Sequence, residues 1–412
     1  MNLEKKKTVF LVCLVVILLV SVFSVRLLLS NERPHGEEYK ALAEQLLSDA
    51  REEFEDIRGV SVREVTLEVV NQSWVIENWG KAYADFDEII REEKIYKALF
   101  MISQDVSLYD VRLEWTGMFH AAKWNGKIYV VEEKFDVTNE FTATSTFVHE
   151  LTHIMQESYS LPERPTFDGA KALTSLKEGD ATFMADIFKN DGVISTSLSV
   201  TVDDKTSLSV PLGFLFGDEI QLSLPSTIDD LNRFPYRYGV EFVKALYNQK
   251  GGWEAVNEAY ENPPRTTEQI MHPEKYFAQE DAQTVEVPSI TGEWNLKKTD
   301  RFGEYFIFVM LDNWLSETDA KNAAEGWGGD LINYYEKDDD FLFTWNIAWD
   351  SSEDAYEFYA AFQDMMDKTS ADNPTDDCWF AYERYLSIQL NENSTLIISS
   401  ADETIVQQPF LG

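Results

Sequence analysis

The stretch from residue 146 to residue 155 carries the pattern His-Glu-x-x-His inside a segment with a helical apolar period. Its apolar residues recur at the spacing of one buried helix stripe: Phe147, Leu151, Ile154 and Met155. His149 and His153 are four residues apart, so they share another face of the same helix, where two imidazoles can converge on one ion. The sequence therefore predicts a helix that presents a two-histidine metal clamp.

Glu150 follows His149 directly and gives the clamp a candidate catalytic base. Neutral imidazole is a good ligand for Zn²⁺, and a site with three protein ligands keeps its fourth position open to water. The Glu150 carboxylate can take a proton from that water and pass it to a leaving amine. The pattern predicts peptide-bond hydrolysis by metal-activated water. The alternative is a helix whose two histidines are ordinary residues of its polar face.

A second helical segment supplies a candidate third ligand. It contains Leu176, Glu178, Gly179 and Ala181 in the pattern Leu-x-Glu-Gly-x-Ala, and Glu178 lies twenty-five positions after His153. Together with His-Glu-x-x-His, this pattern resembles the glutamate-zincin, thermolysin-like group of metallopeptidases, in which a Glu on the next helix completes the metal site. The resemblance implies that His149, His153 and Glu178 hold zinc. Asp180 lies about 200° around the helix from Glu178, so we do not expect it to be a ligand.

A β-hairpin is expected just before the histidine helix. Two strand-like runs, residues 118–124 and 127–131, flank Asn125-Gly126, a dipeptide preferred in tight primed turns. Trp124-Asn125-Gly126 with Tyr129 resembles the hairpin of thermolysin-like enzymes, whose edge strand pairs with the substrate backbone. That hairpin has a substrate-holding Asn where this chain has Ala121, so the chain departs from the pattern at this position.

Residues 234–276 extend the resemblance. Phe-Pro-Tyr before a helix that runs to Gln249, then Gly-Gly-Trp, Thr-Glu-Gln and His-Pro-Glu-Lys-Tyr, are similar to a mostly uncharacterised family of archaeal and bacterial surface proteins provisionally described as zinc metallopeptidases. The similarity covers roughly residues 140–280. Hydrolysis also needs a donor to the developing oxyanion. The candidates are His272, which precedes a proline, and the two tyrosines Tyr238 and Tyr236.

The N-terminus predicts a membrane anchor. Lysines at positions 5–7 precede an apolar run over residues 9–25, which is long enough for one spanning helix with the bulk of the chain outside the cell. A cleaved signal peptide is the competing interpretation. The formal net charge of −38 excludes duplex nucleic acid as a partner and suits an acidic extracellular protein.

The expected fold class is α+β with three segments. Residues 1–30 form the anchor, residues 31–287 a mainly helical zincin-type domain with a small antiparallel sheet, and residues 288–412 a C-terminal α+β domain. Helices are expected at 36–58, 81–100, 302–325 and 352–368, and strands at 62–70, 341–349, 378–390 and 394–406.

Two functions are compatible with these features. The first is a membrane-anchored, outward-facing zinc metallopeptidase that acts on a peptide or protein substrate, with Glu150 and His272 or Tyr238 as catalytic groups. The second is a non-catalytic surface protein that keeps a metallopeptidase fold as a binding or structural module. Ala121 favours the second function, whereas Glu150 favours the first, because a purely structural metal site does not need that carboxylate.

Overall fold

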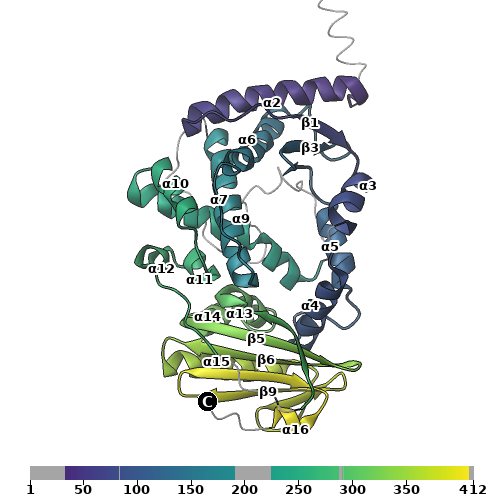
Figure 1. Cartoon of the computed structure of the whole chain (residues 1–412), viewed down its shortest axis with the longest axis vertical. Helices are drawn as coiled ribbons and strands as arrows, with labels where there is room; N and C mark the ends of the chain where they lie inside the picture. The colour runs from purple at the N-terminus through teal and green to yellow at the C-terminus, as the bar shows by residue number, and fades with distance from the viewer. Residues whose placement is uncertain (1–32, 83, 191–223, 287–289, 291, 408–412) are drawn as a thin grey trace, which may run out of the picture.

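The computed structural model describes residues 33–82, 84–190, 224–286, 290 and 292–407. Figure 1 shows a helical part with a small sheet stacked on a part built around a broad sheet, which confirms the α+β class. The predicted anchor at residues 1–30 and the predicted boundary at residues 287 and 288 lie outside the described residues. Within the described ranges, no helix combines the length and the apolarity that a bilayer crossing requires.

The first part contains most of the helices. In chain order its elements are α2 (Gly36–Arg58), β1 (Leu67–Val70), α3 (Gln72–Val75), a π-helical turn (Ile76–Lys81), α4 (Phe86–Ala98), α5 (Leu108–Thr116), β2 (Ala121–Trp124), β3 (Lys127–Val131), α6 (Glu140–Gln156), α7 (Phe167–Lys189), α9 (Ser226–Lys250), α10 (Trp253–Glu261), α11 (Thr267–Met271) and α12 (Pro273–Ala278).

The small sheet has the strand order β1-β3-β2, so β2 is an edge strand. The predicted hairpin is confirmed, and Asn125 and Gly126 both have positive φ, 47° and 70°, as a primed turn requires. The sheet is mixed, whereas the sequence predicted an antiparallel one, because β1 runs parallel to β3. Parallel strands need a crossover connection, which α3, α4 and α5 provide.

The second part is a seven-stranded sheet with the order β4-β5-β6-β10-β9-β8-β7 and helices packed on it. Its elements are β4 (Asn295–Asp300), α13 (Gly303–Asp312), α14 (Glu317–Ala324), β5 (Trp327–Lys337), β6 (Asp340–Trp349), α15 (Ser352–Lys368), β7 (Asp372–Thr375), β8 (Cys378–Ala381), β9 (Arg384–Asn391), β10 (Ser394–Ser400) and α16 (Glu403–Val406). The strand predicted over 378–390 is in fact two strands joined by a turn at Tyr382 and Glu383, which both have positive φ.

One apolar core joins the two parts. It includes Ile95 of α4, Phe242 of α9, Phe306 of α13 and Trp345 of β6, all at or below 1% exposure. The apolar face of α6 belongs to a second core shared with α2 and the small sheet, through Phe147, Phe54 and Val130 among others. The histidine helix is therefore packed on this second core, which burial of apolar surface stabilises.

Helices α7 and α9 cross with their backbones in contact. A Cβ atom on Gly179 would lie 2.2 Å from the carbonyl oxygen of Gly239, and a Cβ atom on Gly239 would lie 2.2 Å from that of Ser175. Only glycine fits at such a crossing. Because Glu178 precedes Gly179 and Tyr236 is one turn before Gly239, the crossing brings these two side chains together.

The sequence predicted a helix after Phe-Pro-Tyr, but α9 begins earlier, at Ser226, and contains Pro235 in its interior. A proline cannot donate to the carbonyl four residues before it, here that of Leu231, and this loss normally ends or kinks a helix. In this structure Lys171 of α7 donates to the Leu231 oxygen at 2.5 Å. The ammonium group replaces the missing partner, and α9 continues through the proline.

We expect Gly239→Ala to lower the free energy of unfolding by about 3 kcal/mol, the upper end for overpacking, since the added methyl meets a main-chain carbonyl that cannot move alone. Chemical denaturation measures this loss. Gly117→Ala is the matched control, because Gly117 has φ −67° and its new Cβ would meet side-chain atoms, those of Ile76 at 3.3 Å and Gln72 at 3.4 Å, and no main-chain atom among its nearest neighbours. A Gly239→Ala protein as stable as this control contradicts the backbone crossing.

Candidate metal centre

Helix α6 aims its two histidines at one point. Asn139 caps its start by accepting a hydrogen bond from the Thr142 amide, and the apolar stripe containing Phe147 fixes the rotation of the helix against the second core. The Nε2 atoms of His149 and His153 are 3.1 Å apart. The predicted i, i+4 clamp is therefore present in the folded chain.

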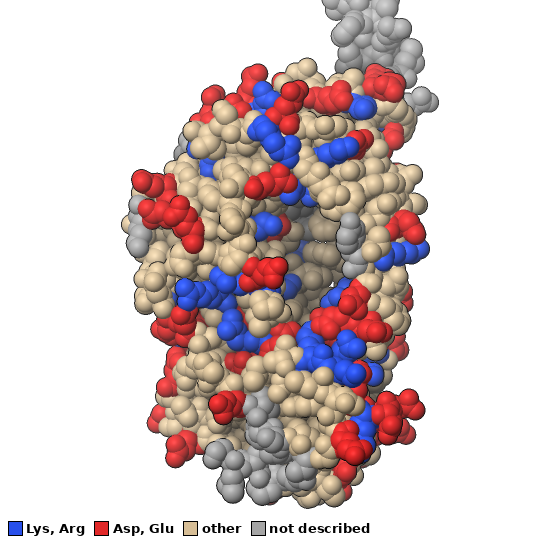
Figure 2. Space-filling view, in the orientation of Figure 1, with Lys and Arg blue, Asp and Glu red and all other residues tan. Residues whose placement is uncertain are grey.

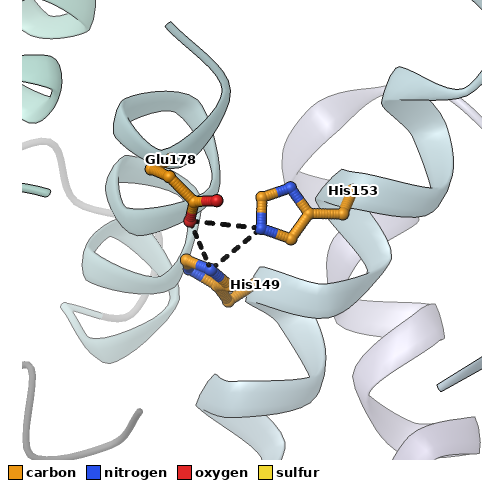
Figure 3. A group of neighbouring side chains, drawn as sticks. All are labelled: His149, His153 and Glu178. Carbon is orange, nitrogen blue, oxygen red and sulfur yellow. Dashed lines mark hydrogen bonds and ion pairs between the residues drawn. The ribbon is translucent and has the colours of Figure 1, made fainter. Parts of the chain in front are cut away.

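Glu178 of α7 completes a triangle with the histidines (Figure 3). Its Oε2 atom lies 3.4 Å from His149 Nε2 and 3.3 Å from His153 Nε2. A tetrahedral ion with bonds of about 2.0–2.1 Å holds its ligand atoms about 3.3–3.4 Å apart. The separations of 3.1, 3.3 and 3.4 Å therefore fit a small divalent ion equally distant from all three atoms.

A hydrogen-bond chain fixes the ring of His153. Its Nδ1 lies 2.9 Å from Gln156 Oε1, and Gln156 Nε2 donates to the Lys177 carbonyl at 2.9 Å. Because an amide oxygen can only accept, Nδ1 carries a proton, and in the neutral ring that a metal requires the lone pair of Nε2 faces the centre of the triangle. This arrangement also links α6 to α7 one residue before Glu178.

The three side chains attract one another strongly. Burial lowers the pKa of His153, but Glu178 raises it more, to about 9. Burial raises the pKa of the Glu178 carboxyl, and the two histidines more than reverse this, so the pKa lies well below its usual range. In the metal-free protein the carboxylate is thus paired with an imidazolium. A divalent cation bound by these residues would take the place of that proton.

Glu150 is buried beside the triangle and is oriented by the edge strand. Its Oε2 accepts the Lys123 amide of β2 at 2.6 Å. The Val131 amide donates to the His120 carbonyl, so the alternating pattern of the hairpin turns the Lys123 amide to the outer edge. Burial raises the pKa of Glu150, against the opposing effect of the two histidines.

Tyr236 is the oxyanion-donor candidate that the structure brings to this site. Its hydroxyl hydrogen-bonds to Glu178, and burial together with the negative charges of Glu178 and Glu150 raises its pKa well above the usual value. The phenol therefore stays protonated and remains a hydrogen-bond donor. Gly239, one turn after Tyr236, is the feature of the sequence that could have indicated this position of Tyr236, because the glycine allows this face of α9 to pack against α7.

The structure places His272 and Tyr238 away from the triangle. His272 Nε2 lies 3.0 Å from Glu304 of α13, in the wall of an acidic cavity of about 750 Å³. The ring of Tyr238 packs on Phe234 and Tyr305. The proline after His272 restricts the backbone of His272. The hydrogen-bond partner of its imidazole, Glu304, belongs to α13, and no local sequence pattern predicts this long-range contact.

Asp180 faces away from the triangle, as the helix period predicts. Arg58 of α2 donates to its two carboxylate oxygens at 2.7 and 3.1 Å, and Tyr260 donates at 2.8 Å. The Arg58 and Asp180 side chains are fully buried. This buried ion pair fixes α7 against α2 two residues after Glu178.

A second group of carboxylates in the described chain could also hold a cation: Glu268, Glu280 and Asp350. Lys275 already lies among them, with its Nζ at 2.5, 2.9 and 3.1 Å from the three carboxylates. This group therefore has an internal cation. The histidine-containing triangle is the better metal centre.

Comparisons with known proteins give little about this site. Residues 293–408, in the second part, match a family described as a domain of unknown function, DUF8575. A presumed hydrolase with a novel fold from Chloroflexus aurantiacus aligns with 63% of this chain and 96% of its own at 15% identity and a TM-score of 0.34. No curated protein matches the chain.

We expect the full chain, purified without added metal, to contain one divalent ion per molecule, and Glu178→Ala to lose it or weaken its binding by at least about 10-fold. Elemental analysis after dialysis measures both. Glu254→Ala, which removes an exposed glutamate of α10, should keep the ion. Equal metal content in the two variants contradicts the triangle.

Proposed function

We propose that this chain is a zinc-dependent metallopeptidase of the glutamate-zincin type, in which His149, His153 and Glu178 hold the metal and Glu150 is the general base. The observation that carries the proposal is the triangle of 3.1–3.4 Å with the buried Glu150 beside it. Two imidazoles and one carboxylate form a donor set typical of catalytic zinc, with a position left for water.

When bound, zinc polarises the scissile carbonyl and lowers the pKa of water towards about 7. The protein residues do the rest. Glu150 accepts the proton of the attacking water and returns it to the leaving amine, and a raised pKa suits both steps near neutral pH. The Lys123 amide holds one carboxylate oxygen of Glu150, so the base does not have to be reoriented during the reaction.

Tyr236 donates to the oxygen that becomes negative when the carbonyl is attacked. Its O–H already lies at Glu178, next to the metal position, and its high pKa keeps the proton on the phenol. We therefore assign the role of oxyanion donor to Tyr236, one of the three candidates that the sequence offered, with His272 and Tyr238.

The outer edge of β2, which pairs with no further strand among the described residues, supports a peptide as the substrate. The main-chain groups of Ala121 and Lys123 point off the sheet, since those of their neighbours hydrogen-bond to β3. The Lys123 amide already donates to Glu150, so Ala121 and the Lys123 carbonyl are the groups offered to a substrate. An extended peptide can add to this edge through main-chain hydrogen bonds, which hold it beside Glu150 without selecting its side chains. Ala121 has no side-chain amide that could hold the substrate, unlike the Asn at this position in thermolysin-like hairpins. Main-chain hydrogen bonds therefore provide a larger share of the substrate-binding energy than in those enzymes.

The cellular setting is part of the proposal. The apolar run over residues 9–25 anchors the chain in a membrane, and the acidic remainder faces outward, where it meets a peptide or protein substrate. On the face shown in Figure 2, Asp and Glu side chains are spread over the described residues with Lys and Arg among them. Such a surface keeps a protein soluble and does not favour nucleic acid.

We expect Glu150→Gln to lower the rate of cleavage of a fluorogenic peptide library by about 10²–10⁴-fold while the zinc content is unchanged, because the amide keeps the shape of the side chain but cannot accept the proton. Full activity in Glu150→Gln contradicts the assigned base. If the wild-type chain binds zinc but cleaves no peptide, the non-catalytic surface module is the better account.

Tyr236→Phe should keep the metal and lower kcat by about 10²–10³-fold with a smaller change in KM, since an oxyanion donor acts mainly in the transition state. Steady-state kinetics on one cleaved peptide measures the two constants. Tyr238→Phe is the matched control, because Tyr238 packs in the core away from the triangle. Equal kcat values for the two variants contradict the assignment of Tyr236.

A further inference from the structure

The small sheet has two faces, and α6 packs against one of them. Ala121 of β2 and Val130 of β3 pair with each other and belong to the apolar core shared with α6. Because successive side chains of a strand point to opposite faces, Ala122, Trp124 and Tyr129 belong to the other face. This second face borders the same β2 edge at which we place the substrate.

Four aromatic rings meet on this second face, and we call them the aromatic shelf: Trp74, Trp79, Trp124 and Tyr129. Trp74 is stacked on Tyr129, with ring centroids 5.2 Å apart and an interplanar angle of 16°. The Trp124 ring lies 5.6 Å from Tyr129 and 6.2 Å from Trp79. All three tryptophans are partly exposed, so the shelf presents apolar surface beside the β2 edge.

A rare backbone conformation builds part of the shelf. Residues Ile76–Lys81 form a π-helical turn directly after α3, and Trp79 lies in this turn. Single π-helical turns are uncommon and often occur at functional sites. Gly80 lies so close to α5 that a Cβ atom on it would be 2.7 Å from Leu113 Cδ2. The turn is thus packed tightly on α5, which supports the position of Trp79 on the shelf.

Ala122 leaves room at the border between the shelf and the sheet edge. The neighbouring β2 side chains on the same face are His120 and Trp124, each two residues away, or about 6.8 Å along the strand. All three residues are partly exposed. Between the two large side chains lies a position that holds only a methyl group, so a side chain of an added strand fits there.

The hydrogen-bond pattern of β2 places a substrate side chain at this position. The main-chain groups of Ala122 point to β3, where it pairs with Tyr129, and those of its two neighbours point outward. A strand added antiparallel to this edge therefore meets Ala122 in a non-hydrogen-bonded pair, in which the Cα atoms are about 4.5 Å apart and the side chains are closest. Paired residues share a face of the sheet, so the substrate side chain opposite Ala122 lies on the shelf beside Trp124.

The charges next to the shelf occur in oppositely charged pairs. Lys127 pairs with Trp124 across the hairpin, and its Nζ lies 2.7 Å from Glu68 of β1. In the π-helical turn, Lys81 Nζ lies 3.0 Å from Glu77. Because each charge is offset by its partner, these pairs do not favour a charged substrate side chain over an apolar one.

We propose that the aromatic shelf selects substrates with an aromatic or bulky aliphatic side chain at the residue opposite Ala122. This inference rests on the proposed peptidase function and on the addition of the substrate to β2. A large apolar side chain there contacts the Trp124 indole, and an aromatic one adds edge-to-face or stacked attraction, which a small side chain cannot provide. Because the shelf is only partly enclosed, the preference for phenylalanine over alanine is about 10-fold in kcat/KM, the low end for apolar discrimination.

Digestion of a random peptide library by the full chain, with the products sequenced by mass spectrometry, tests this selection. We expect aromatic residues and leucine to be enriched at one fixed position counted from the cleaved bond. Two peptides that differ only by phenylalanine or alanine at that position then measure the ratio of kcat/KM values. Cleavage without such enrichment overturns the role of the shelf and leaves the proposed function standing. No cleavage at all overturns the proposed function, and this inference with it.

Two variants assign the preference to the shelf. Ala122→Ile fills the space with a residue that strands favour, and Trp124→Ala removes one wall. We expect each to lower kcat/KM for the phenylalanine peptide by about 10-fold and to change that for the alanine peptide by less than about 2-fold. Tyr356→Ala, which removes a ring that is 60% exposed on α15, is the matched control and should keep the wild-type ratio. The proposal is overturned if both shelf variants keep that ratio, or if they slow the two peptides equally.

Discussion

The contact between the backbones of α7 and α9 is the constraint on which the site depends. At Gly179 and Gly239 the two helices approach so closely that a methyl group on either would overlap a main-chain carbonyl oxygen. Lys171 stabilises the same pair by satisfying the carbonyl that Pro235 leaves free. As a result, Glu178 and Tyr236 meet on one side of the crossing, and α6 brings the two histidines to the same point.

Electrostatic attraction among His149, His153 and Glu178 stabilises the triangle, in addition to its geometry. Burial of a carboxylate with two imidazoles costs desolvation energy, which their mutual attraction offsets. This attraction raises the pKa of His153 and lowers that of Glu178. The Gln156 bridge and the buried Arg58–Asp180 pair keep the ligand helices in register. The geometry of this candidate metal centre is set by the packing of four helices, α2, α6, α7 and α9, and local sequence patterns indicate only its candidate ligands.

Much of the site could be predicted from the sequence because its parts are local. The spacing of His149 and His153 follows from one helical turn, and the Asn125-Gly126 turn follows from backbone preferences. The proximity of Tyr236 to Glu178 and the positions of His272 and Tyr238 depend on how α9, α11 and α13 pack, which no period of the sequence encodes. The early start of α9 could not be predicted either, since the group that compensates for Pro235 is sixty-four residues away, at Lys171. Strand β5 was missed because Gly328 and Gly329 interrupt its pattern at a bulge.

The most direct test of the central claim is X-ray absorption spectroscopy at the zinc edge on the full chain as isolated. Coordination by two imidazole nitrogens and a carboxylate oxygen at about 2.0–2.2 Å, with a further light-atom ligand, is the predicted result. A chain that is folded yet shows no zinc, or zinc without histidine scattering, contradicts the account of His149, His153 and Glu178 as a metal centre.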